Sequence, residues 1–191
     1  LGIRTNRNSC GMDLMCALLG KAPYFGLLTD EGREAKWLIE VKTKGEPDWG
    51  VLGGAIGEKC VEDVPYIVGI DQFFGGKITP ENLHKVKSMG AATASSGAVG
   101  LYHVENLTPE ALDHGRDLLA EGYQTYVIDD AEIERVRNTF PNLWPKHVKK
   151  PNRAYIGCPH NTYHEMVYWG TRIHEELKRR NLEKVAIPTH M

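Results

Sequence analysis

The chain has 191 residues, of which 41% are hydrophobic and 25% charged, and its formal net charge is −2. This length suits one domain or a large and a small lobe, and the apolar content is sufficient for a buried core. The nearly balanced charge gives no reason to expect a nucleic acid or an anionic membrane as partner. No apolar stretch approaches the roughly 20 residues that a membrane-spanning helix needs. Four scattered cysteines match no disulfide framework, so we expect a cytoplasmic protein.

The first part of the chain alternates helix and strand signals. Ser9 is a suitable N-cap for a helix that Gly20 ends. Pro65 indicates an edge strand, since proline has no N–H to donate to a neighbouring strand. The next expected elements are a strand at 36–41, a helix at 49–58 whose four glycines lower its helix propensity, and a strand at 64–70.

Two helix starts are marked by a hydroxyl cap, a proline and an acid. They are Thr79-Pro80-Glu81 and Thr108-Pro109-Glu110. We expect the second helix to continue to Gly122. Between the two, a Ser/Gly turn should lead into a buried strand within residues 94–104. The elements expected next are a strand at 126–128 and a short helix that follows Asp129 and Asp130 and runs to about Phe140.

The last part of the chain follows a stretch with three prolines at 141–153, which indicates a loop or linker. A strand is expected at 153–157, the longest helix at 162–180 and a closing strand at 184–189. On the helix, we expect i,i+4 ion pairs. They join Glu175 to Arg179 and Glu176 to Arg180.

Strands that alternate with helices predict an α/β fold with a mostly parallel sheet, here in two lobes. We assign residues 1–140 to an α/β region, 141–153 to a linker, and 154–191 to the start of a further α/β lobe. Ligands of such sheets bind at the carboxyl ends of the strands. We expect the turns at Ser95 and Cys158 to lie there.

The strongest chemical signal is Cys158, which lies between an expected strand and the start of a long helix. The positive end of a helix dipole favours thiolate, the form that binds iron or attacks an electrophile. His160 could supply a second ligand or carry a proton. The alternative interpretation is a buried, inert cysteine at a strand end, and we expect Cys10, Cys16 and Cys60 to be packing residues of that kind.

Two other polar motifs could bind an anion. One has two guanidinium groups, a hydroxyl and an amide, which suit a carboxylate or phosphate, and consists of Arg4, Thr5, Asn6 and Arg7. The other could hold oxygen atoms through hydroxyls and backbone N–H groups, and consists of Ser95, Ser96 and Gly97. From the residues alone, a solvated surface turn is the default interpretation of the first motif and a plain helix-to-strand turn that of the second. His103 is expected to be a hydrogen-bonded core histidine.

Four stretches occur together and in order in one known family. They are residues 1–7 (LGIRTNR), 94–103 (ASSGAVGLYH), 107–111 (LTPEA) and 157–160 (GCPH). With them the chain resembles the large subunit, or catalytic domain, of aconitase X, an iron-dependent dehydratase branch of the aconitase superfamily. The resemblance implies an aconitase-like fold. Because family members are longer and this chain begins at Leu1 rather than at methionine, we expect an internal fragment.

The resemblance also implies roles for residues. Cys158 corresponds to an iron ligand of an iron–sulfur cluster or mononuclear iron, which would act as a Lewis acid on the leaving hydroxyl. Asn161 would contact the substrate, and His160 would be a further ligand or an acid. The residues of the first motif, Arg4, Thr5, Asn6 and Arg7, would hold the carboxylate or phosphate. Ser95, Ser96 and Gly97 would hold the other substrate oxygens, with Ser96 and His160 as the catalytic candidates.

The family places further iron ligands and the catalytic base outside this segment. The base is a serine on a swivelling domain, which is a small partner subunit or a fused domain. We therefore expect the isolated chain to be inactive. When complete, it would be a hydro-lyase that dehydrates a small β-hydroxy acid such as 5-phosphomevalonate or cis-3-hydroxyproline.

Two alternatives from other classes remain open. The first is a non-catalytic α/β module that binds an anion or a partner, with Cys158 as a structural or redox-sensing thiol. The second is a thiolate enzyme with Cys158 as nucleophile and His160 or His103 as base.

Overall fold

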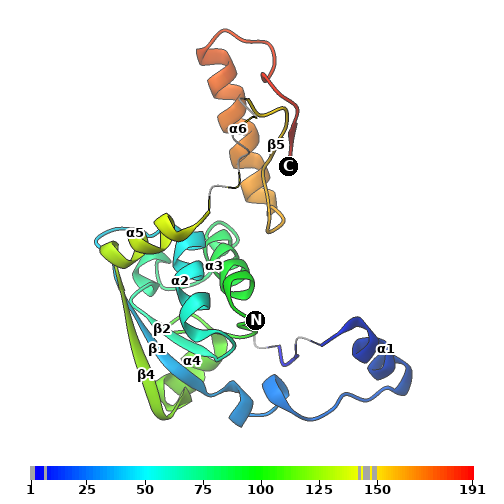
Figure 1. Cartoon of the computed structure of the whole chain (residues 1–191), viewed down its shortest axis with the longest axis vertical. Helices are drawn as coiled ribbons and strands as arrows, with labels where there is room; N and C mark the ends of the chain where they lie inside the picture. Colours follow the sequence, from blue (N-terminus) through cyan, green and yellow to red (C-terminus); the bar gives the residue numbers. More distant parts are fainter. Residues whose placement is uncertain (1–2, 7, 142, 144–146, 148–149) are drawn as a thin grey trace.

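The computed structural model describes the whole chain except residues 1–2, 7, 142, 144–146 and 148–149. Its centre is a four-stranded sheet in the order β3-β2-β1-β4, and every neighbouring pair is parallel (Figure 1). The strands are β1 (Ala35–Lys42), β2 (Pro65–Val68), β3 (His103–Val104) and β4 (Leu119–Asp129). The α/β fold with a parallel sheet is thus confirmed.

Helices cover both faces of this sheet, because β1 alternates its side chains between two apolar clusters. Trp37, Ile39 and Val41 belong to the larger cluster, whereas Leu38 belongs to the smaller one. The larger cluster is completed by α2 (Trp49–Cys60), α3 (Leu83–Ser96) and α5 (Asp130–Thr139). The smaller cluster includes Ala111 of α4 (Pro109–His114). The short 3₁₀ helices are η1 (Gly26–Leu28), η2 (Glu31–Arg33), η3 (Asp71–Phe73) and η4 (Gly115–Leu118).

The glycines of α2 weaken its helix propensity but allow α3 to approach closely. A Cβ atom on Gly53 would lie 2.2 Å from the backbone oxygen of Met89 and 2.7 Å from Cβ of Ala92. The expected helix therefore forms, and its N-terminus is capped by Asp48, which accepts hydrogen bonds from the N–H groups of Gly50 and Val51. Tertiary packing overrides propensity at this position.

Two outer parts extend from this body, as Figure 1 shows. The first contains α1 (Cys10–Leu19), which Ser9 caps and Gly20 ends with a left-handed φ of 63°, as predicted. The second contains α6 (Tyr163–Arg179) beside a two-stranded parallel sheet of β5 (Ala154–Tyr155) and β6 (Thr189–His190). In the described chain, no helix is long and apolar enough to cross a membrane.

Several expected boundaries were wrong. β2 lies between β1 and β3 rather than at an edge; Pro65 is tolerated because it is the first residue of the strand. The helix that starts at Pro109 ends at His114, because Gly115 has a left-handed φ of 55° and Leu119 already begins β4. The start signal at Thr79 forms a turn whose carbonyl accepts from the N–H groups of Asn82 and Leu83, and α3 follows it.

The Ser/Gly segment is also different from its prediction. Ser95 and Ser96 form the last turn of α3, with Gly97 as C-cap, and β3 has only two residues. The N–H of Ala98 donates to the carbonyl of Val61, just after α2 and before β2. This segment therefore lies toward the amino ends of the strands, because α2 and α3 both run antiparallel to them, and not at the carboxyl ends.

Two details of the last part were corrected. The closing strand is the pair Thr189–His190 rather than 184–189. Arg179 and Arg180 both pair with Glu176, while Glu175 pairs with Arg172. Of the two predicted i,i+4 pairs, only Glu176–Arg180 is therefore confirmed.

Candidate functional site

The loop from Ile156 to Asn161 carries Cys158 and is closed by its own side chains. Asn161 Nδ2 donates to the carbonyl oxygen of Ile156 over 2.7 Å. Gly157 has a φ of 118°, and a Cβ there would lie 3.0 Å from Asn161 Nδ2, so glycine suits this position. The Cys158–Pro159 peptide is cis, and Cys158 is exposed. Asn161 thus braces the loop; its role in substrate contact stays a prediction.

Cys158 and Pro159 lie beside an open groove on the outer side of the helical layer, which we call the Cys158 groove. Its other lining residues are Asp48, Trp49 and Gly50 at the start of α2, and Ser88, Ala91, Ala92 and Ser95 on α3. The structure therefore brings two predicted site residues, Cys158 and Ser95, to one place. The Cys158 turn follows the carboxyl end of β5, in the small sheet.

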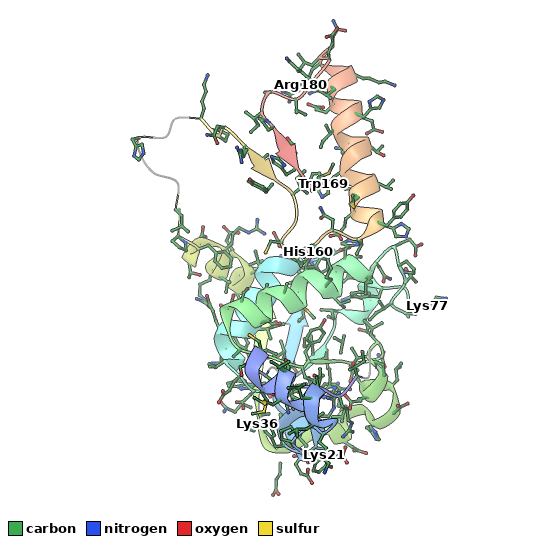
Figure 2. The ribbon with its side chains drawn as sticks, turned by 90° about the vertical axis from the view of Figure 1, so that its right-hand side faces the viewer. Lys21, Lys36, Lys77, His160, Trp169 and Arg180 are labelled. Atoms are coloured by element: carbon green, nitrogen blue, oxygen red, sulfur yellow. The ribbon has the colours of Figure 1, made fainter. Side chains whose placement is uncertain are left out.

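Lys87 connects α3 to the Cys158 loop, and the sequence interpretation missed it. Its Nζ donates to the carbonyl oxygen of His160 over 2.6 Å and to Glu165 Oε2 over 2.5 Å. Figure 2 places His160 where the C-terminal part meets α3. The net pKa of Glu165 is lowered. Burial acts to raise it, but the hydrogen bonds from Lys87 and Thr162 stabilise the carboxylate more strongly. The sequence offered a signal only for the partner of Lys87: Thr162 followed three residues later by Glu165 is a capping-box pattern.

The N-terminal motif contacts its own chain. Arg4 Nη2 lies 2.5 Å from Asp30 Oδ1, and its Nη1 donates to the carbonyl of Leu28 over 3.3 Å. Asn6 accepts from the N–H of Leu27 and donates to the carbonyl of Phe25, and Thr5 donates to the carbonyl of Asn6. Arg7 lies outside the described residues. The anion clamp stays a prediction, and here Arg4 is held by a carboxylate of the protein.

A buried ionic cluster lies next to Arg4. Arg33 is 2% exposed and binds Glu110 through two hydrogen bonds, Nε to Oε1 over 2.6 Å and Nη2 to Oε2 over 2.5 Å. Arg4 Nη2 lies 3.8 Å from Glu110 Oε1. The hydrogen bond from Arg33 lowers the pKa of Glu110. The sequence indicated Glu110 only as a helix-start acid, because nothing local marks Arg33 as its partner.

His103 belongs to the same cluster. It is buried, its Nε2 lies 2.9 Å from the carbonyl oxygen of Arg33, and burial lowers its pKa. The prediction of a hydrogen-bonded core histidine is confirmed. His103 is not among the lining residues of the Cys158 groove, so no contact supports it as a base for Cys158.

The remaining candidates are dispersed. Ser95 Oγ donates to the carbonyl of Ala92 at the groove, whereas Ser96 does not line it. Gly97 is taken up by the end of α3, where a Cβ would lie 2.4 Å from the carbonyl oxygen of Gly57. Cys60 is buried and burial raises its pKa to about 12, as expected for a packing cysteine. Cys10 is exposed, so that part of the prediction was wrong.

The described residues do not form a complete metal site. Among them, no three His, Cys, Asp or Glu side chains gather in a way that could hold a metal ion. Cys158 has His160 nearby in sequence, but no third donor gathers with them among the described residues. The residues that the structure describes therefore do not fit a whole iron site.

The model for the second domain of aconitase X matches residues 35–138, more than half of the chain. The chain belongs to the aconitase X family. The matched range is almost the same as the α/β body built from β1 to α5. The parallel sheet that begins at Ala35 and the three helices on its larger cluster are thus the aconitase X second domain.

Curated relatives of this aconitase X chain are named dehydratases. Phosphomevalonate dehydratase large subunits are 34% identical over 87% of the chain in Thermococcus kodakarensis and 31% over 95% in Methanocaldococcus jannaschii. A cis-3-hydroxy-L-proline dehydratase of Pseudomonas aeruginosa is 40% identical over 59% of the chain. The chain covers 39%, 43% and 19% of these proteins, respectively.

A solved structure agrees with these relatives. The holo-form of Thermococcus kodakaraensis aconitase X aligns with a TM-score of 0.75 and 33% identity. The alignment covers 99% of this chain and 44% of that one. The similarity therefore extends beyond the second domain to both outer parts, although this chain spans less than half of that structure.

Proposed function

We propose that this chain is part of the catalytic subunit of a hydro-lyase that removes water from a small β-hydroxy carboxylic acid. The observation that carries the proposal is the similarity, over most of the chain, to phosphomevalonate dehydratase large subunits. 5-Phosphomevalonate is therefore the first candidate substrate. cis-3-Hydroxyproline is the second, since the relative with 40% identity is named for a reaction on that compound.

We propose iron, as an iron–sulfur cluster or a mononuclear ion, as the cofactor, with Cys158 as one ligand. The exposed thiol at the Cys158 groove supports this role. Because the described residues do not fit a whole site, the other ligands have to come from elsewhere in the protein.

The substrate would lie in the Cys158 groove in this proposal. Ser95 lines this groove and His160 follows Cys158 in the same loop, which supports both as candidates for polar contact or proton transfer. Ser96 and Gly97, at the end of α3, do not line the groove and are therefore weaker candidates. Arg4, Thr5 and Asn6 could act as a clamp only if the ion pair between Arg4 and Asp30 opens.

A partner is part of the proposal. The relatives are called large subunits, which supports a small subunit, or a fused swivelling domain, that supplies the base. We expect the isolated chain to be inactive for that reason. We also propose that residues 1–140 and 154–191 belong to two lobes joined by 141–153, and that the enzyme is cytoplasmic, as its cysteine use suggests.

The test is an anaerobic preparation of the full-length protein with its small partner, in wild-type form and as Cys158→Ser. Iron and acid-labile sulfide are measured per chain, and dehydration of both candidate substrates is assayed. Iron in the wild type that is lost in Cys158→Ser, together with activity on one substrate, supports the proposal.

Two contrary outcomes would count against the proposal. Equal iron in both proteins removes Cys158 from the metal site. No iron and no activity on either substrate would overturn the hydro-lyase proposal and favour the non-catalytic module.

A further inference from the structure

Lys87 lies on α3 and contacts the loop that carries Cys158. The next residue, Ser88, lines the Cys158 groove, and Lys87 itself points to the loop that carries the cysteine. Its side chain is 22% exposed, and that of its partner Glu165 is 19% exposed. A partly buried ammonium with two short hydrogen bonds is held more firmly than a surface lysine, since it is screened less by solvent.

The two acceptors of Lys87 belong to two different structural units. The carbonyl of His160 lies in the loop, two residues after Cys158, and Glu165 lies in the first turn of α6. Glu165 Oε2 also accepts from the N–H of Thr162 over 2.7 Å. One ammonium therefore joins α3 to both the loop and the capped end of α6.

Few other polar contacts join these parts. Between residues 154–191 and the α/β body, the described chain has one more close approach of a basic and an acidic side chain, from His164 Nε2 to Glu81 Oε1 at 3.9 Å. That contact is longer, and both side chains are largely exposed. The position of the Cys158 loop over α3 therefore depends mainly on Lys87 among these polar contacts.

We propose that Lys87 is a positioning residue that holds the Cys158 loop against α3, so that the thiol stays beside Ser95 in the Cys158 groove. The inference deepens the proposed function, because a thiol that ligates iron must be fixed relative to its other ligands. The positioning itself is a geometric claim, and it can be tested without metal.

The first experiment measures this geometry in the full-length protein without iron. Ser95→Cys introduces a second thiol at the groove, and a short bismaleimide joins it to Cys158; peptide mapping identifies the product. We expect Lys87→Met to slow this cross-link about tenfold, which is the effect of losing charge-assisted hydrogen bonds. Lys87→Arg keeps the positive charge and can donate to both acceptors, so it should retain most of the rate.

Lys36→Met is the matched control. Lys36 makes a similar ion pair, 3.0 Å to Asp63, but at the start of β1; Figure 2 shows it far from His160. Its removal should leave the cross-linking rate unchanged. An unchanged rate in Lys87→Met would overturn the inference, and so would the absence of a cross-link in the Ser95→Cys protein with Lys87 intact.

The second experiment measures iron in the enzyme assembled with its partner. In Lys87→Met we expect a lower iron content at limiting iron, with recovery in Lys87→Arg. If cross-linking slows but iron and activity do not change, the positioning stands and its link to iron binding fails, whereas the ligand role of Cys158 itself fails only if Cys158→Ser retains iron. The two failures are therefore distinguishable.

Discussion

The α/β body and the two outer parts of this chain differ in what stabilises them. The body, from β1 to α5, has a continuous apolar cluster in which Ile39, Leu52 and Ile67 are completely buried. Of the residues that the structure describes in α1 and α6, none is buried. α1 leaves Leu18 and Leu19 more than 70% exposed. A ten-residue helix without tertiary packing is only marginally stable in water.

This difference matters for function because the outer parts carry most of the residues predicted for chemistry. Arg4, Thr5 and Asn6 lie before α1, and Cys158, His160 and Asn161 lie before α6. The body supplies one wall of the groove through α2 and α3. The candidate site thus lies where the α/β body meets a segment with little core of its own. Contacts that join the two, such as those of Lys87, are therefore expected to fix its geometry.

The largest effect is expected in the core of the body. Leu52→Ala should lower the free energy of unfolding by about 4 kcal/mol, because Leu52 is fully buried and the change leaves a cavity. Leu18→Ala, in α1, should change it by less than about 0.5 kcal/mol. Urea denaturation measures both. Similar losses in the two variants would contradict the contrast between body and outer parts.

The buried ion pair gives the next largest effect. Arg33→Met should cost about 3 kcal/mol, because it leaves the Glu110 carboxylate without its partner in a mostly buried site. Urea denaturation at neutral pH measures this loss, and Lys36→Met, which breaks an exposed pair, should cost less than about 1 kcal/mol.

The same pair predicts a pH dependence. The pKa of Glu110 is lowered in the folded state, so its ionised form stabilises the protein fully above the unfolded carboxyl pKa of about 4.3. This stabilisation is lost as the pH falls through the lower, folded pKa. The difference in unfolding free energy between wild type and Glu110→Gln should therefore shrink below about pH 4. A constant difference would contradict the assignment.

Replacing a glycine by alanine should change stability in opposite directions in the body and in α6. Gly53→Ala in α2 should destabilise by about 2 kcal/mol, because the new Cβ would collide with the backbone of Met89. Gly170→Ala in α6 meets no atom within 4 Å and should stabilise that helix by about 0.5–1 kcal/mol. Denaturation curves and circular dichroism measure the two effects. Loss of helix in Gly170→Ala would mean that α6 packs closely there.

A local effect, similar in size to that of Gly170→Ala, is expected at the start of α6. Thr162→Ala removes the capping hydrogen bond to the N–H of Glu165 and should cost about 1 kcal/mol locally. Amide hydrogen exchange should become faster in the first turn of α6 and stay unchanged in β1 and β2. Equal acceleration in the body would show that the two regions unfold as one unit.

Local chemistry in the sequence was sufficient for many elements. Ser9 and Gly20 predicted the ends of α1 correctly, because caps act within a few residues, and the strand expected at 36–41 forms as β1. Helix ends were less certain. Leu119 suited both a helix and a strand, and pairing with β1 decided for the strand. Pro65 signalled an edge, yet strand order depends on contacts that are distant in sequence.

The sequence by itself determined the fold class, the caps of α1, the Cys158 loop as a candidate and, through motifs in order, the aconitase X family. Only the tertiary structure decided that Ser95 shares a groove with Cys158, that Arg33 holds Glu110, and that Lys87 holds the cysteine loop. The last two contacts join residues separated by more than 70 positions. Such pairs leave no periodic or capping signal, because they arise from the way packed elements bring distant side chains together.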